Sequence, residues 1–559
     1  EENNLATTFL LGPGTTFIDN ISTGAGQIHD ANIPAGAPGC TDPVTQIPFA
    51  QLSTAGGFGG CGPGGFAPAK SLGKGDHNNF GPRVGFAWDI FGNGKTSLRG
   101  GFGVAYEGTL YNPLSNSRWN LPYYSLNLVD TPWNGGTANI IYGPAGCPIC
   151  GSTPTFTGPP TNVGQGVGVQ ATGNLSGWDA TNSNLAGLTG IVLPQGIRDP
   201  YVYNYFLSMQ REVLPKLVIE VNYVGTTGHK LFRAEDANRI PGSRLPAGTC
   251  TQDNLGRTIC SQLGPFNGTG RLNPNYGTLR VWENAVNSNY NALQVSVRKQ
   301  MTRGIQFTVN YTWSHSIDGG SSWHSGATTA NGFSAGEGFT LDQTMPSLDR
   351  GDSLFDIRHR AVANYIWEMP WAKGKGGFTE AVFGGWTLNG IWSFQSGAHW
   401  SPFASRSPRL TGDCSQAGIN AGLCINTGGD YNLDHVNNDR PDAAADNVNA
   451  THDMWANGFS LPAGFFTAPC LGCVGNLGRN TFVGPGTWVA DMSLLKNIKV
   501  SEKVNLQFRS EFFNIFNHTN FVLATAGAAG NNKFTASNFG QAGGTLNSRN
   551  IQFGLKLTF

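Results

Sequence analysis

The last residues of the chain alternate strictly between apolar and polar side chains. The apolar residues are Ile551, Phe553, Leu555, Leu557 and Phe559, and the residues between them are Gln552, Gly554, Lys556 and Thr558. A period of two predicts a β-strand with one apolar face and one polar face. The segment has the ~9–11 residues that a tilted strand needs to cross a membrane. The pattern therefore predicts a membrane-spanning strand that ends on an aromatic residue.

The same alternation recurs upstream, in segments paired across short turns. Residues 305–313 show it clearly, and residues 92–95 (Gly-Asn-Gly-Lys) form a turn of the kind that hairpins favour. We predict eleven strands, at about residues 82–91, 96–107, 200–213, 216–225, 289–301, 304–316, 357–368, 384–395, 487–496, 503–513 and 549–559. The fold class is therefore all-β, an antiparallel transmembrane barrel.

The connections between these strands fall into two length classes. Five are short, at residues 92–95, 214–215, 302–303, 369–383 and 497–502, and five are long, at residues 108–199, 226–288, 317–356, 396–486 and 514–548. Short periplasmic turns and long extracellular loops are typical of transmembrane barrels. All ten cysteines lie in the long class or in residues 1–79. Their placement outside the predicted strands and short turns supports the register independently.

Residues 1–79 fall on the extracellular side in this register, and residues 80–559 hold the eleven strands. Bacterial single-chain barrels have an even number of strands. We therefore expect residues 80–559 to be the C-terminal portion of a larger barrel, and residues 1–79 to be an extracellular loop region with a truncated start. A further strand at residues 16–21 is the alternative, and it would leave residue 1 on the periplasmic side.

Composition narrows the class of protein. Charged residues make up 13% of the chain and aromatic residues 11%, and the net charge is zero. No run approaches the ~20 apolar residues of a transmembrane helix. A neutral chain gives no reason to expect a nucleic-acid partner. The sequence favours outer-membrane lipid as the first partner of the strands.

The cysteines fall in five close pairs. They are Cys40 and Cys61, Cys147 and Cys150, Cys250 and Cys260, Cys414 and Cys424, and Cys470 and Cys473. An even number at short spacings predicts local disulfides in an oxidising compartment. Zinc is the alternative for the two CxxC pairs, but no histidine or second CxxC follows at the spacing of a zinc finger. We expect five disulfides and no metal site.

Five blocks of the sequence resemble one family, the TonB-dependent, Oar-like outer-membrane receptors. They are FGPRVGFAWDIFGNGKTSLRGGFGVAYEG from Phe80, YNALQVSVRKQMTRGIQFTVNYTWSHSID from Tyr290, FDIRHRAVANYIWEMP from Phe355, FGGWTLNGIWSFQSG from Phe383, and LGRNTFVGPGTWVADMSLLKNIKVSEKVNLQFRSEFFNIFNHTNF from Leu477. Their order and spacing match the C-terminal half of the family's barrel. The resemblance implies a 22-stranded barrel, closed at Phe559, with a plug domain and a TonB-contacting box N-terminal to the strands. None of those N-terminal parts is among the residues that carry the resemblance.

Motifs for catalysis are weak, and we expect no enzyme, no catalytic residue and no cofactor. Residues 332–336 match G-x-S-x-G but lie in a Gly/Ser-rich loop, without the strand and helix that the motif requires. Residues 94–96 (Gly-Lys-Thr) form a hairpin turn and lack the first glycine of a phosphate-binding loop. Residues 430–446 concentrate oxygen ligands, yet His435 replaces the glycine of an EF-hand and Pro441 its bidentate glutamate. A solvated loop is favoured there, with a different kind of calcium site as the alternative.

The long loops carry aromatic residues that could bind a ligand. The candidates are Trp119, Tyr123, Trp133, Trp282, Trp323, Trp400 and Trp455. Exposed aromatic rings can stack on sugars or anchor peptides, but loops of this length also need small cores of their own. Packing of one loop against another is therefore the favoured reading.

Taken with the resemblance, these patterns imply a receptor or transporter in the cell outer membrane. It would capture an extracellular ligand on its loops and pass it through the lumen when TonB pulls on the plug. One alternative is an adhesive surface barrel that transports nothing. The other is a soluble all-β binding protein or glycosidase, against which the apolar faces of Trp386, Leu388 and Trp392 argue.

Overall fold

The computed structural model describes residues 76–107, 198–236, 279–321, 345–402, 473–501, 504–522 and 544–559, together with shorter segments between and before them. Among them, none of the helices has the length and apolar character that a membrane span requires.

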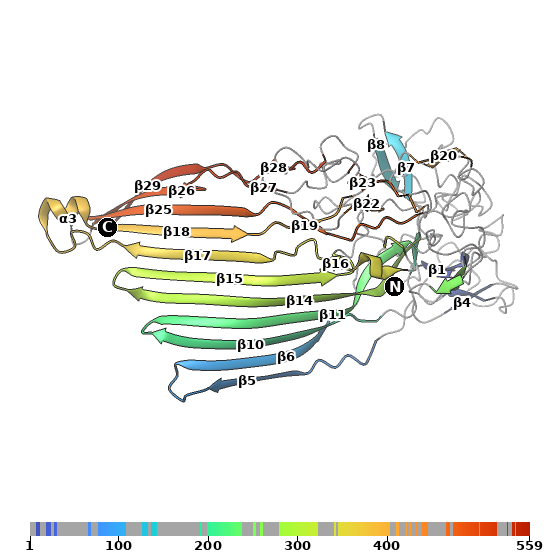
Figure 1. The fold of residues 1–559 in the computed structure, drawn as a ribbon, viewed down its shortest axis with the longest axis horizontal. Coiled ribbons are helices and arrows are strands. Elements are labelled where there is room, and N and C mark those ends of the chain that lie inside the picture. The colour runs from blue at the N-terminus through green and yellow to red at the C-terminus, as the bar shows by residue number, and fades with distance from the viewer. Residues whose placement is uncertain are drawn as a thin grey trace.

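One sheet dominates the molecule (Figure 1). It has 13 strands, two of which, β9 (Gly190–Val192) and β16 (Gly351–Asp352), lie off its main path. The main path runs through β5 (Arg83–Asp89), β6 (Thr96–Tyr106), β10 (Tyr201–Leu214), β11 (Leu217–Asp236), β14 (Leu279–Thr302), β15 (Ile305–Asp318), β17 (His359–Glu368), β18 (Trp386–Gln395), β25 (Thr487–Lys499), β26 (Asn505–Phe513) and β29 (Asn550–Thr558). Each strand pairs antiparallel with the next one along the chain, so the sheet is a continuous meander.

These strands coincide with the eleven predicted from the alternation, and most ends agree within two or three residues. The main difference is at β11 and β14, which continue about ten residues beyond the predicted ends. Their extra ladder pairs Ala234 with Trp282 and Glu235 with Val281. All four residues are buried, so packing rather than alternation stabilises the extension.

The ladder registers place most of the large apolar residues of the strands on one face of the sheet. Phe553 lies opposite Ser510, which lies opposite Leu494. Leu494 in turn faces Leu388, and Leu388 faces Trp367. Because directly opposed residues in an antiparallel pair share a face, we call this the apolar face. It is exposed: Leu555 is 70% accessible and Phe553 is 69% accessible.

The opposite face carries polar residues in the same continuous way, and we call it the polar face. Gln552 lies opposite Glu511, Glu511 opposite Ser493, and Ser493 opposite Asn389. The Gln552 amide donates a hydrogen bond to the Glu511 carboxylate. A sheet with one exposed apolar face and one polar face is the arrangement predicted for a membrane barrel wall.

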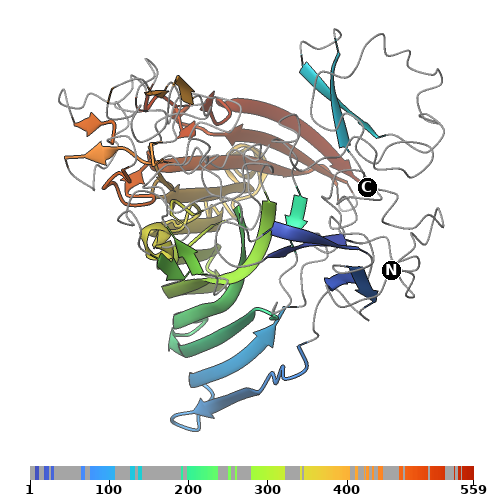
Figure 2. The same cartoon turned by 90° about the vertical axis from the view of Figure 1, so that its right-hand side faces the viewer.

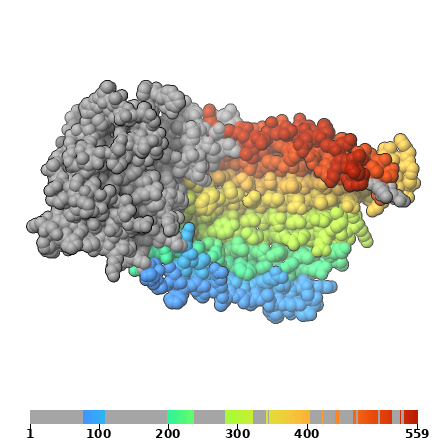
Figure 3. Space-filling view, turned by 180° about the vertical axis from the view of Figure 1, so that it is seen from behind, coloured from blue at the N-terminus to red at the C-terminus, as the bar shows by residue number. Residues whose placement is uncertain are grey.

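The connections separate to the two ends of the sheet (Figure 1). The short ones lie with the C-terminus at what we call the turn end, together with helix α3 (Gly377–Phe383) in the connection from β17 to β18. The described strands of the long ones lie at the other end, which we call the loop end. Space-filling colours run in chain order across the sheet as parallel bands (Figure 3).

Seen from the loop end, the strands trace an arc from β5 to β29 (Figure 2). These two strands terminate the sheet order, and within the described residues they are not paired with each other. The sheet is therefore a curved, open wall with two edges.

Smaller strand pairs accompany the main sheet. Residues before 76 contribute one sheet of four strands, β1 (Thr7–Leu11), β2 (Ile18–Thr23), β3 (Gln27–Asp30) and β4 (Gly65–Pro68). The two-stranded pairs are β7 (Leu126–Thr131) with β8 (Gly136–Ile141), β12 (Cys250–Gln252) with β13 (Thr258–Cys260), β19 (His399–Trp400) with β24 (Phe482–Val483), β20 (Leu410–Gly412) with β21 (Cys424–Asn426), β22 (Asp442–Ala443) with β23 (Phe466–Thr467), and β27 (Phe521–Val522) with β28 (Gly544–Thr545). All of the two-stranded pairs come from the long connections.

Candidate functional site

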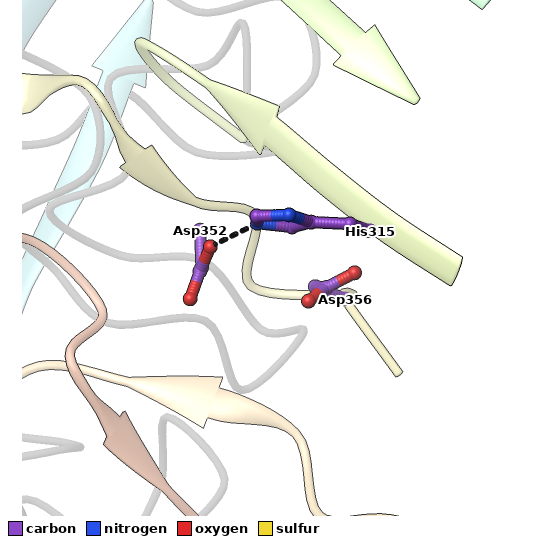
Figure 4. Close-up of side chains that lie close together, drawn as sticks. All are labelled: His315, Asp352 and Asp356. Atoms are coloured by element: carbon purple, nitrogen blue, oxygen red, sulfur yellow. Dashed lines mark hydrogen bonds and ion pairs between the residues drawn. The ribbon is translucent and has the colours of Figure 1, made fainter. Parts of the chain in front are cut away.

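A cluster of charged side chains lies where β15 and β16 meet at the loop end (Figure 4). His315 Nε2 is 2.7 Å from Asp352 Oδ1 and 2.8 Å from Arg358 Nη2. The Arg358 Nη2 group also donates to both Asp352 oxygens at 3.0 Å. The short β16 strand brings Asp352 beside β15, because it pairs with Ile317.

Asp356 and His399 also belong to this cluster. Asp356 is buried, and its Oδ1 accepts the backbone N–H of Ser316 at 2.7 Å, which fixes the carboxylate. His399 Nδ1 lies 3.0 Å from the Asn480 carbonyl oxygen and 3.2 Å from Asp352 Oδ2. The site therefore joins β15, β16 and β19 with the residues just before β17.

His315, Asp352 and Asp356 offer ligand atoms within 4.8 Å of one another. One imidazole and two carboxylates suit a divalent cation. Arg358 already pairs with both carboxylates, because its Nη2 lies 3.0 Å from Asp352 Oδ1 and its Nε lies 2.7 Å from Asp356 Oδ2. The guanidinium supplies the positive charge that a cation would bring. The arrangement therefore fits a network of ion pairs better than a metal centre.

Asp352 is the member of this cluster whose acidity is perturbed. Burial acts to raise its pKa, but the hydrogen bond from His315 and the electrostatic influence of His399 and Arg358 act in the opposite direction. The net effect holds the pKa of Asp352 below its ordinary value. The carboxylate is thus kept ionised beside the Arg358 guanidinium.

Further buried ion pairs tie the loop end together. Arg479 donates to Asp318 at 2.7 Å and Arg440 to Asp349 at 3.0 Å. In each pair both side chains are at least nine-tenths buried. A third pair, between Arg233 and Glu283 at 2.9 Å, crosses the extended part of the β11–β14 ladder. Buried charges of this kind are costly to separate, so they hold the loops in one arrangement.

The structure describes two of the seven aromatic residues that the sequence offers as ligand-binding candidates. Trp282 and Trp400 are 2% and 6% accessible, so both are packed inside the loop end. Trp400 lies 5.4 Å from Phe482 between ring centroids and shares a small core with Leu477. For these two residues the packing role is the one observed. Trp119, Tyr123, Trp133, Trp323 and Trp455 lie outside the described residues.

The acidic segment at residues 430–446 is described in part. Asp439 Oδ2 accepts the backbone N–H groups of Tyr431 and Asn432, the second at 2.8 Å. Asn432 is fully buried and donates to the Leu341 carbonyl oxygen at 2.9 Å. In these contacts Asp439 and Asn432 serve to hold the loop. Asp430, Asp434 and Asp446 lie outside the described residues.

Three of the cysteine pairs have a described member. Cys473 is disulfide-bonded. Cys250 lies directly opposite Cys260 across the β12–β13 ladder, which brings the two backbones side by side. Cys424 lies in β21. Cys40, Cys61, Cys147, Cys150, Cys414 and Cys470 lie outside the described residues.

Several residues of the charged cluster and the ion pairs were not selected from the sequence. Asp352, Asp356 and Arg358 occur together in the segment GDSLFDIRHR, directly before a predicted strand. That concentration of charge at the loop-side start of a strand is a usable signal. Arg440 and Arg479 carry no comparable signal, because their partners lie more than 90 residues away.

Comparison with known proteins gives one family match. A family model described as "Outer membrane beta barrel domain" matches residues 23–552. None of the curated proteins matches the sequence.

Solved structures resemble the chain weakly. The outer membrane transporter YddB from Escherichia coli is 10% identical with a TM-score of 0.37, over 86% of this chain and 40% of that one. The siderophore receptor PiuA from Acinetobacter baumannii is 9% identical with a TM-score of 0.33, over 85% of this chain and 35% of that one. An enterobactin complex of the receptor PfeA from Pseudomonas aeruginosa is 10% identical with a TM-score of 0.38, over 86% of this chain and 40% of that one. The chain thus spans two-fifths or less of the length of these proteins.

The family match covers nearly the whole chain, and the sheet has the single exposed apolar face that contact with lipid requires. The short connections and the C-terminus lie together at the periplasmic end, and the long loops lie at the extracellular end. The chain belongs to the outer membrane β-barrel domain family, and its place is the outer membrane.

Proposed function

We propose that the chain is the C-terminal barrel portion of a TonB-dependent, Oar-like receptor that takes up a ligand from outside the cell. One observation carries the proposal. The five sequence blocks that resemble this family fall in chain order on strands of a single wall, namely β5, β6, β14, β15, β17, β18, β25 and β26. We expect no enzymatic activity. The wall would form part of a passage, and its loops would form the entrance to that passage.

The polar face supplies the wall that such a passage needs. Arg509 donates to Gln507 at 2.6 Å, and Gln507 donates to Asn497 at 2.8 Å. Thr226 donates to Asn204 at 3.0 Å on the other side of the wall. Hydrogen-bonded polar side chains of mixed type suit a water-filled lumen or contact with a plug domain. A plug and TonB would be the partners that open the passage.

The open edges of the wall support the assignment to a larger barrel. β5 and β29 each present a row of backbone N–H and C=O groups that a neighbouring strand can pair. In lipid, unpaired groups of this kind cost several kcal/mol each. We infer that residues 80–559 form part of a closed barrel whose remaining strands complete these edges.

Binding of the full-length gene product to TonB tests the proposal. The protein would be extracted from outer membranes in detergent and passed over an immobilised TonB C-terminal domain. We expect retention, and loss of retention when a peptide carrying the TonB box of a known receptor competes. A correctly folded protein that is not retained would contradict energy-coupled uptake.

A surface adhesin is the second candidate. The packing of Trp400 and Phe482 and the buried pair of Arg479 with Asp318 show that the loop end has a built interior of its own. Such a structure could bind a surface without transport. Adhesion that persists when TonB is deleted, together with absence of TonB binding, would favour this candidate.

A further inference from the structure

The connection between β17 and β18 differs from the other turns at the periplasmic end. The turn from β10 to β11 has two residues and the turn from β14 to β15 also has two, whereas this one runs from residue 369 to 385 and contains α3. It exposes three aromatic side chains. Trp371 is 53% accessible, Phe378 is 82% and Phe383 is 58%.

Contacts with Trp367 and Trp386 hold residues 369–385 beside the apolar face of the wall. Trp371 packs on Trp367 of that face, with ring centroids 6.1 Å apart. The Trp386 indole N–H, also from the apolar face, donates to the Val382 carbonyl oxygen at 3.0 Å. The exposed aromatic residues therefore continue a surface that already meets lipid.

A lysine from the neighbouring strand fixes the end of α3. Lys496 Nζ donates to the Val382 carbonyl oxygen at 3.2 Å and to the Gly384 carbonyl oxygen. The same ammonium group lies 5.3 Å from the centre of the Trp386 ring. Because β25 holds the end of the helix, the segment keeps its position relative to the wall.

The most exposed charged side chains of this segment are positive. Lys373 and Lys375 are exposed and lie two and four residues after Trp371 in the sequence. The acidic residue of the segment, Glu380, is engaged internally, because its carboxylate accepts the Gly376 N–H at 2.8 Å. Aromatic rings with flanking lysines suit the boundary between hydrocarbon and anionic headgroups.

We propose that residues 371–383 form a membrane-surface anchor that binds anionic phospholipid headgroups of the periplasmic leaflet. Phe378, Phe383 and Trp371 enter the headgroup boundary, and Lys373 and Lys375 pair with the phosphates. The anchor needs only the outer-membrane placement of the wall and is independent of transport.

Site-specific photo-crosslinking tests the anchor. The full-length gene product would carry benzoylphenylalanine at position 378 in outer membranes of a Gram-negative host, with resistance to heat as the check on folding. Asn93, in the exposed β5–β6 turn at the same end, is the matched control position. Mass spectrometry after irradiation identifies the adducts.

We expect phospholipid adducts at position 378 and background yield at position 93. Changing Lys373→Gln or Lys375→Gln should lower the yield of phosphatidylglycerol adducts by roughly fivefold for each lysine. Adducts only to protein at position 378 would show a second copy or a periplasmic partner instead and would overturn the proposal. Equal lipid yield at positions 378 and 93, or no effect of the lysines, would also overturn it.

Discussion

At the scale of the residue, the two faces of β29 give opposite expectations for the same substitution. Leu555 lies on the apolar face and Gln552 on the polar face. Leu555→Arg should cost ~2–4 kcal/mol near the bilayer midplane, whereas Gln552→Arg should be mild, because the polar face meets water. Unfolding by urea in lipid vesicles measures the free energy of unfolding of both variants. Equal tolerance of the two variants would refute the register.

Asp352 gives a prediction about acid stability. Its pKa is lowered in the folded protein, so its contribution to stability is present above the ordinary value of 3.8 and is lost as the pH falls through the folded pKa. We expect the loop end to lose stability below that value. Asp352→Asn should cost ~1–3 kcal/mol at neutral pH, because it leaves Arg358 and His315 with a weaker partner.

The measurement is the melting temperature at about pH 7 and at about pH 3, which brackets the ordinary carboxyl range. The wild-type protein should lose more on acidification than Asp352→Asn does. Identical pH dependence in the two proteins would show that this carboxylate does not contribute.

At the scale of the element, the period of two located all eleven wall strands because each strand meets lipid on one face and water on the other. The signal fails where that contrast ends. The extension of β11 and β14 is stabilised by burial of Ala234 and Trp282. The charged cluster was missed for the same reason. Asp352 and His315 come together through a loop whose path the alternation does not encode.

The small hairpin of β12 and β13 carries a prediction about the cysteines. Since Cys250 and Cys260 are directly opposite, we expect them to be joined, and the other four sequence neighbours likewise. Peptide mapping under non-reducing conditions should recover Cys250 linked to Cys260 and Cys147 linked to Cys150. Recovery of either with another partner would contradict this connectivity. Release of bound zinc by a chelator would favour metal at the CxxC pairs.

At the scale of the whole molecule, the open edges predict that residues 1–559 produced alone do not form a stable barrel. Closing this wall on itself would pair β5 with β29. Both run from the loop end to the turn end, so the seam would be parallel, unlike that of bacterial single-chain barrels. On a semi-native gel, residues 1–559 should lack heat-resistant folding and the full-length gene product should show it. Heat-resistant folding of residues 1–559 alone would contradict the larger barrel.

One face of this wall meets lipid and the other meets water. Spin labels at single added cysteines along β15, from residue 305 to 310, test it directly in lipid vesicles. Positions 305, 307 and 309 should be accessible to oxygen, which partitions into lipid, and positions 306, 308 and 310 to a water-soluble nickel complex. Accessibility that alternates with a period of two and in this phase is the predicted result. The opposite phase, or no alternation, would contradict the account.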